Sequence, residues 1–172
     1  MTLDHAYNVL FLCTGNSARS ILGESIVNHL GRDHFKGFSA GSQPKGEVHP
    51  YSLDLLASLH LPIKGLFSKS WDLYATAGAP QMDFIFTVCD SAAGEACPAW
   101  PGQPMTAHWG IPDPAAVEGS EVERRAAFRQ AYAALENRIG LFLSLPLASL
   151  DKMTLQNRLN TIGRQTPSTA AA

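Results

Sequence analysis

The most constraining feature of this chain is a short apolar segment that runs directly into a cysteine. Residues 8–12, Asn-Val-Leu-Phe-Leu, precede Cys13, and Arg19 follows six positions later. A continuous apolar run of this kind is typical of a strand that is buried on both faces of a parallel sheet. A five-residue loop between a thiol and a guanidinium can close around one tetrahedral oxyanion, with its N–H groups pointing inward and Arg19 donating two hydrogen bonds. The segment therefore predicts chemistry on phosphate or an ion of similar shape.

The residue types after the cysteine suit such a loop. We expect Gly15 to allow a tight turn, and Asn16 and Ser17 to shape the loop through side chain-to-backbone hydrogen bonds. The helix that follows would add its positive N-terminal end. The candidate oxyanion-binding residues are Thr14, Gly15, Asn16, Ser17, Ala18, Arg19 and Ser20.

The same positive field would act on the thiol itself. It would lower the pKa of Cys13 and make this residue a thiolate nucleophile, to which Ser20 could donate a hydrogen bond. Taken alone, a cysteine and an arginine at this spacing form a weak motif, which also fits a buried cysteine and a surface arginine. The apolar strand before the motif and the helical pattern after it favour the functional interpretation.

Length, charge and hydrophobic content limit the classes of protein to which this chain can belong. A chain of 172 residues with 45% hydrophobic content is enough for one domain with its own core. A formal net charge of −2 gives no broad basic face, which argues against nucleic acid as a partner. No apolar run approaches the roughly 18 residues of a membrane span, and the N-terminus does not resemble a signal peptide. We therefore expect a cytoplasmic protein without a membrane partner, whose three cysteines are too few for a disulfide scaffold.

Strand and helix patterns alternate along most of the chain. Strands are expected at residues 8–12, 37–40, 82–88 and 105–109. Helices are expected from about residue 18 to Gly31, at 50–59, near 71–74 and at 121–143. One side of the last helix carries most of its apolar residues, namely Val122, Ala126, Phe128, Tyr132, Leu135, Ile139 and Phe142.

This order predicts an α/β fold, a small open and mainly parallel sheet with helices on both faces. A ligand would then lie at the carboxyl ends of the strands, where Cys13, Cys89 and Trp109 are all expected. We expect residues 1–145 to form this domain. Residues 146–172 are expected to form a C-terminal extension, with a helix at 150–162 and then a frayed tail.

Asp113 follows the last expected strand, in the segment Ile-Pro-Asp-Pro. A thiolate that attacks an oxyanion expels a poor leaving group, so a general acid has to deliver a proton. A carboxyl group in a stiff loop at the sheet edge suits that role, and an apolar neighbour such as Trp109 could keep it protonated. An aspartate before proline is also common in turns. We favour the catalytic role because of the position in the sheet, and expect His108 to be structural.

Cys89 and Cys97 bear on which reaction takes place. Cys89 follows a predicted strand, and the segment from Asp90 to Pro104 is rich in glycine, alanine and proline, which predicts a loop. A phosphatase needs one cysteine and water, whereas a reductase that oxidises its own thiol needs a resolving thiol and a second one to carry the disulfide outward. Two incidental cysteines are the alternative. A metal site is not expected, because no partner ligand stands at zinc spacing.

Four segments together resemble the arsenate reductases built on the low-molecular-weight tyrosine phosphatase fold. They are Cys-Thr-Gly-Asn-Ser-Ala-Arg-Ser at 13–20, Phe-Ser-Ala-Gly at 38–41, Thr-Val-Cys-Asp with Cys-Pro within 87–98, and His-Trp-Gly-Ile-Pro-Asp-Pro-Ala at 108–115. The resemblance covers about residues 8–143. It implies a four-stranded parallel sheet and reduction of arsenate to arsenite, with no bound cofactor.

The resemblance also implies a role for each candidate catalytic residue. Cys13 would attack arsenic while Asp113 protonates the departing hydroxide, with Arg19 holding the oxyanion. Cys89 would then attack Cys13 and release arsenite. Cys97 would attack Cys89, leaving a disulfide for an external thiol reductant.

The chain departs from this family at several positions. Ala18 stands where many members have a further cysteine, and the gap between Cys89 and Cys97 is one residue longer than in thioredoxin-coupled members. Because of this longer gap, the resemblance leaves two reductants open, thioredoxin and glutathione with glutaredoxin. Some members bind potassium beside the loop, and Asn16, Glu24 and Ser39 resemble part of that site. The family has a carboxylate near residues 69–70, where this chain has Lys69 and Ser70, and a lysine there argues against the ion.

Two other functions stay open. The loop and Asp113 would equally serve a phosphatase acting on phosphotyrosine or small phosphate esters. An oxyanion- or arsenic-binding regulator that uses three thiols is a non-enzymatic alternative, but it would leave Asp113 unused.

Overall fold

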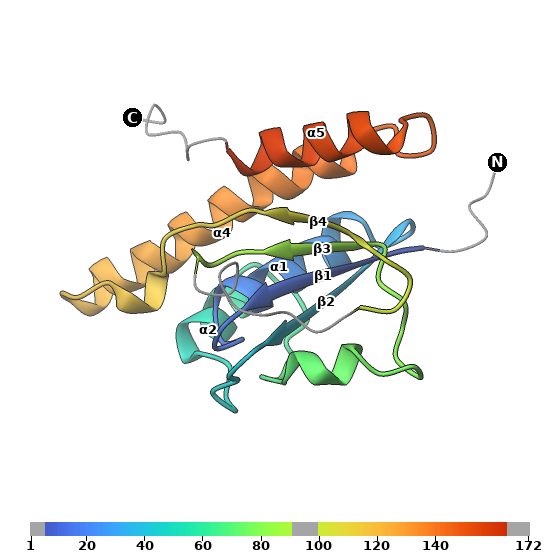
Figure 1. Ribbon diagram of the computed structural model, residues 1–172. Coiled ribbons are helices and arrows are strands. Elements are labelled where there is room, and N and C mark those ends of the chain that lie inside the picture. The colour runs from blue at the N-terminus through green and yellow to red at the C-terminus, as the bar shows by residue number, and fades with distance from the viewer. Residues whose placement is uncertain (1–5, 91–99, 165–172) are drawn as a thin grey trace.

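The computed structural model describes residues 6–90 and 100–164 and is built on one parallel sheet (Figure 1). Its strands are β1 (Tyr7–Cys13), β2 (Phe35–Gly41), β3 (Phe84–Thr87) and β4 (Met105–His108), in the order β2-β1-β3-β4. All three neighbouring pairs are parallel. The predicted fold class, a small open parallel sheet with four strands, is confirmed.

The helices follow the predicted pattern closely. The α-helices are α1 (Arg19–Leu30), α2 (Pro50–Ser58), α4 (Glu121–Leu143) and α5 (Lys152–Gly163), and two short 3-10 helices are η1 (Trp71–Tyr74) and η2 (Pro114–Ala116). The bounds of α4 agree with the prediction, but Val122 was expected on the buried side and is 74% exposed. Val122 is in the first turn of α4, at the end of the helix that extends beyond the sheet (Figure 1).

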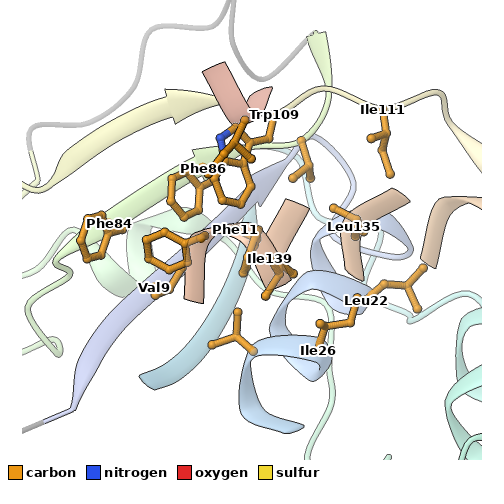
Figure 2. Packing of buried hydrophobic residues seen from close by; sticks show 14 of the residues in the cluster. Val9, Phe11, Leu22, Ile26, Phe84, Phe86, Trp109, Ile111, Leu135 and Ile139 are labelled. Carbon is orange, nitrogen blue, oxygen red and sulfur yellow. The ribbon is translucent and has the colours of Figure 1, made fainter. Parts of the chain in front are cut away.

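Strand β1 is buried on both faces, because alternate side chains enter two separate cores. Val9 and Phe11 belong to the larger cluster, which also includes side chains of α1, α4 and α5. Figure 2 shows both residues together with side chains of α1 and α4. Leu10 and Leu12 belong to a smaller cluster on the other face, which includes Tyr74 of η1. This double burial explains the continuous apolar run in the sequence and fixes β1 in the centre of the sheet.

Helix α5 completes the larger core. The Trp109 ring, directly after β4, stacks on Phe86 with 3.7 Å between ring centroids, and its Nε1 donates to the carbonyl of Leu159 at 3.0 Å. Leu155, Leu159 and Ile162 are all buried in the same cluster. The predicted helix at 150–162 is thus present and packs against the sheet domain, while the division at residue 145 stays a prediction.

Two sequence predictions fall partly outside the described residues. These are the glycine- and alanine-rich segment at 90–104, of which 91–99 are not described, and the tail from residue 165. In the parts of the chain that the structure covers, no helix is both long enough and apolar enough to cross a bilayer.

The strand order determines where along the sheet a ligand can bind. Strand β2 lies on one side of β1 and β3 on the other, so the strand order reverses direction at β1. In open parallel sheets such a reversal leaves a crevice at the carboxyl ends of the two adjacent strands, here β1 and β3. Cys13 ends β1, and Cys89 lies two residues beyond β3. The fold therefore brings these two cysteines to adjacent strand ends.

We predict that Leu159→Ala lowers the free energy of unfolding by about 3 kcal/mol, because it opens a cavity beneath Trp109. Urea denaturation followed by tryptophan fluorescence measures this loss. Met153→Ala, in the same helix, is the control and should cost little, since Met153 is 77% exposed. Equal stability of the two variants would contradict the packing of α5 into the core.

Candidate active site

The anion loop (residues 13–19) joins β1 to α1 and has an open helix end beside it. Ala18 is the N-cap of α1 and makes no side-chain capping bond, and the first turn of the helix carries no acidic residue. The first N–H groups of a helix have no partners within the helix, so an uncapped N-terminus is suited to an anion. The sequence expectation of a positive helix end at the loop agrees with this geometry.

The carbonyl groups of the anion loop are turned outward by a second segment. The β2–α2 segment (residues 42–49) runs alongside the loop and donates three backbone N–H groups to it. The bonds are Gln43 N to Thr14 O at 2.9 Å, Lys45 N to Gly15 O at 3.0 Å and His49 N to Ser17 O at 2.9 Å. Because these carbonyls are held outward, the loop can present N–H groups to its interior, which is what an anion requires.

Asn16 makes the turn that was expected of Gly15. Its φ is +46°, in the left-handed region that asparagine tolerates better than most residues. Its Nδ2 donates to Ser20 Oγ at 2.8 Å, and its Oδ1 accepts the backbone N–H of Lys69 at 2.9 Å. The predicted bracing role of Asn16 is therefore seen, together with a strained backbone that the sequence did not indicate. Ser20, expected to donate to the thiol, accepts from Asn16.

Two glycines leave space for chain segments that pack against the loop. A Cβ on Gly41, the last residue of β2, would lie 2.4 Å from the carbonyl oxygen of Thr14. A Cβ on Gly15 would meet the side chain of Lys45, whose nearest carbon would be 3.2 Å away. The glycines in the motifs Cys-Thr-Gly-Asn and Phe-Ser-Ala-Gly thus allow close approach of neighbouring chain segments.

Arg19 and Asp113 face each other at the mouth of the loop. Arg19 Nη1 donates to the carbonyl of Ile111 at 3.0 Å, and its Nη2 lies 3.6 Å from Asp113 Oδ2. The other oxygen of Asp113 accepts the N–H of Ala115 at 2.9 Å, which fixes the carboxyl group at the start of η2. The structure thus places the predicted general acid beside the predicted anion-binding arginine.

Trp109 does not take the place expected for it beside Asp113. Its ring is fully buried and stacked on Phe86, because that side chain points back into the core, whereas the side chain of Asp113 is 40% exposed. His108 has the structural role that was expected, since its ring bonds Thr87 Oγ1 and Asp90 Oδ1, each at 2.8 Å.

Arg138 of α4 was missed by the sequence reasoning. It is only 4% exposed, and its Nη1 donates to the carbonyls of Trp109 and Gly110 at 2.8 and 2.9 Å. Burial lowers its pKa, yet the two carbonyls stabilise the guanidinium. Arg138 and Arg19 thus hold the segment that carries Asp113 at two points. A charged residue on the apolar side of the helix, one turn from Leu135, was the signal in the sequence.

Cys13 and Cys89 are both buried and are hydrogen-bonded to each other. This hydrogen bond, and then burial, raise the pKa of Cys13, while Arg19 and the N–H of Thr14 act in the opposite direction. The expected lowering of this pKa is therefore outweighed by the contact with the second thiol and by burial. Two thiols in contact titrate as a pair, and the charge of one opposes ionisation of the other. Thr14 Oγ1 also lies 3.7 Å from Cys89 Sγ.

The third predicted cysteine, Cys97, lies outside the described residues. The other candidates except Ser20 line one cavity of about 430 Å³, whose lining includes Cys13, Arg19, Cys89 and Asp113. Gln43 and Lys45 also line this cavity, and the sequence reasoning assigned no role to either.

Lys69 places a buried positive charge next to the anion loop. Its Nζ donates to the carbonyl of Phe67 at 2.7 Å and to Ser39 Oγ at 3.3 Å, and it lies 3.6 Å from Glu24 Oε1. Ser39 in turn donates to Glu24 at 2.6 Å. Burial lowers the pKa of Lys69 and raises that of Glu24. Since the ammonium lies beside both Glu24 and Ser39, these residues do not fit an added potassium ion.

Known proteins share both the sequence pattern and this fold. The family model for low molecular weight phosphotyrosine protein phosphatase matches residues 8–156. The chain belongs to this family. It is 34% identical over 134 residues to an arsenate reductase of Halalkalibacterium halodurans, a match that covers 78% of this chain and 93% of that protein. The resemblance drawn from the four sequence motifs is confirmed.

Solved structures of arsenate reductases agree with this assignment. The protein from Archaeoglobus fulgidus matches with a TM-score of 0.63 and 26% identity, over 80% of this chain and 99% of that one. A thioredoxin-dependent arsenate reductase from Corynebacterium glutamicum has the same fold, with a TM-score of 0.59 and 22% identity over 85% of this chain and 65% of that one.

We predict that Lys69→Met destabilises the protein by about 3 kcal/mol, because Glu24 is left buried without its cationic partner. The free energy of unfolding in urea measures the effect. Lys64→Met, at an exposed lysine of the same connection, is the matched control. Glu24→Gln added to Lys69→Met should restore much of the loss. A Lys69→Met variant as stable as Lys64→Met would contradict this role.

We also predict that Cys89→Ala lowers the pKa of Cys13, because it removes the largest cause of the upward shift. The pH midpoint for alkylation of Cys13 by iodoacetamide, followed by mass spectrometry, should move to lower pH. Cys97→Ala removes one thiol from the same chain and provides the comparison. A midpoint that is unchanged, or that moves to higher pH, would show that Cys89 does not control the thiol.

Proposed function

We propose that this protein reduces arsenate to arsenite, with Cys13 as nucleophile and Cys89 as resolving thiol. The contact between these two side chains at the base of an anion-binding loop carries the proposal. Similarity to arsenate reductases within the same family supports it. A hydrolase would need only the first thiol, whereas the reduction of As(V) needs two electrons, which a pair of thiols can supply.

The first step uses the loop and the general acid. Arsenate binds with its oxygens on the loop N–H groups and Arg19, and the Cys13 sulfur forms a bond to arsenic. One As–O bond breaks, and Asp113 donates a proton so that the oxygen leaves as water. The charge of the bound anion and its transition state is stabilised by groups that the fold has already oriented.

The second step uses the neighbouring thiol. Cys89 attacks the Cys13 sulfur and forms a disulfide, and the bond between sulfur and arsenic breaks. Its electron pair stays on arsenic, which leaves as arsenite in the +3 state. The two electrons come from the two thiols, so the protein finishes one turnover oxidised.

A third thiol and an external reductant would complete the cycle. Cys97 would attack Cys89, free Cys13 and form a Cys89–Cys97 disulfide. Thioredoxin, or glutathione with glutaredoxin, would then return two electrons. Both are thiol systems of reducing compartments, in line with the expected cytoplasmic location.

The cavity wall favours a small inorganic ion over an aryl phosphate. Among the described residues that line the cavity, none is aromatic. A phosphotyrosine would therefore find no ring to stack on at the mouth of the loop. Hydrolysis of small phosphate esters is the alternative function, because the loop and Asp113 serve both reactions.

Variants of the two thiols test the proposal. Cys13→Ser should abolish both arsenate reduction and phosphate ester hydrolysis, since it removes the nucleophile of each. Cys89→Ser should lower multiple-turnover arsenate reduction by about two orders of magnitude or more, yet leave hydrolysis of p-nitrophenyl phosphate intact, because water resolves the phosphoenzyme. NADPH-coupled assays with thioredoxin and glutaredoxin systems supplied separately measure the first activity and identify the reductant.

Steady turnover of arsenate by Cys89→Ser with either reductant would contradict the proposal. Phosphate ester hydrolysis by the wild-type protein without any arsenate reduction would instead establish the phosphatase.

A further inference from the structure

The Lys45 side chain lies along the anion loop. A Cβ on Gly15 would be 3.2, 3.3 and 3.4 Å from its Cε, Cγ and Cδ, so the methylene stem runs across the face of that glycine. The backbone N–H of Lys45 donates to the carbonyl of the same residue at 3.0 Å. The residue is thus tied to the loop through both its backbone and its stem.

The glycine at residue 15 leaves room for this contact. The left-handed turn of the loop is made by Asn16, so Gly15 is not required for its conformation. A Cβ at position 15 would lie in tight contact with three carbons of the lysine stem, which would have to shift by a few tenths of an ångström. The glycine thus leaves room for the stem of Lys45, which lines the cavity together with Cys13 and Asp113.

The charges at this mouth favour an anion. Asp113 and Arg19 form an ion pair at 3.6 Å, and their charges offset each other. The charge of Lys45 therefore leaves these three residues with a net charge of about +1. The charge of Lys45 is also felt at His49, whose pKa is lowered by burial and then by Arg124 and Lys45. A partly enclosed site of this kind concentrates the field of an added cation on its ligand.

We propose that Lys45 is a specificity-determining residue of this cavity, which binds an outer oxygen of a small inorganic oxyanion held in the loop. Arsenate or phosphate leaves the mouth of the cavity free for the ammonium. An ester would place its alcohol group there, so it would gain less from Lys45. The inference deepens the proposed reductase function, because it explains how a loop shared with phosphatases selects an inorganic substrate.

Binding of inorganic phosphate tests the inference without turnover. Lys45→Met keeps a stem of similar length and removes the charge, whereas Lys45→Arg keeps the charge. Lys152→Met, at the start of α5, removes the same charge away from the described cavity lining. We expect the Kd for phosphate, from isothermal titration calorimetry, to rise about fivefold to tenfold in Lys45→Met, since one hydrogen bond to a charged group is lost. Lys45→Arg and Lys152→Met should stay within about twofold of wild type.

Kinetics give a second measurement. In Lys45→Met the KM for arsenate should rise by the same factor as the Kd for phosphate, with little change in kcat, and kcat/KM for p-nitrophenyl phosphate should change less than kcat/KM for arsenate. An unchanged Kd in Lys45→Met, or an equal loss in Lys152→Met, would overturn the inference. If the wild-type protein reduces no arsenate, the proposed function fails, but the phosphate titration still decides the role of Lys45.

Discussion

The outward hydrogen bonding of the anion-loop carbonyls is the constraint on which the rest of the site depends. A short loop after a buried strand can point its carbonyls or its N–H groups toward a ligand, and only the second arrangement binds an anion. Here the β2–α2 segment donates backbone N–H groups to the carbonyls of Thr14, Gly15 and Ser17. Gly41 permits this close approach, because any side chain there would collide with the loop. The hydrogen bonds from the β2–α2 segment therefore leave the N–H groups of the loop available to an anion.

The topology adds the second requirement, a thiol next to the first. Parallel neighbours β1 and β3 end at the same edge of the sheet, so Cys13 and Cys89 meet although they are far apart in sequence. Their contact raises the pKa of Cys13. A bound oxyanion and the attack on it would separate the roles of the two thiols, one bonded to the substrate and the other left to resolve it. In the proposed reduction, the same neighbouring thiol would supply the second electron.

The sequence predicted the local unit of strand, loop and helix well, because that unit is encoded by neighbouring residues. The unbroken apolar run of β1 and the capped start of α4 at Ser120 are signals of this kind. The errors came from side chains whose direction depends on distant elements. Trp109 follows β4 but turns into the core, where α5 completes its hydrogen bonding. Lys45 was overlooked since its partner, a glycine of the loop, leaves no pattern in sequence. Arg138 left a signal, a charge on the apolar side of α4, but the two backbone carbonyls that it binds could not be identified from sequence.

The most direct test of this account is a single turnover without reductant. Fully reduced protein is mixed with excess arsenate and quenched with acid, arsenite is quantified, and the remaining thiols are alkylated and mapped by mass spectrometry. The account predicts one arsenite and two lost thiols per chain, with a Cys13–Cys89 disulfide trapped when Cys97 is replaced by serine. Arsenite formed without loss of thiols, or a disulfide that omits Cys13 in that variant, would contradict it.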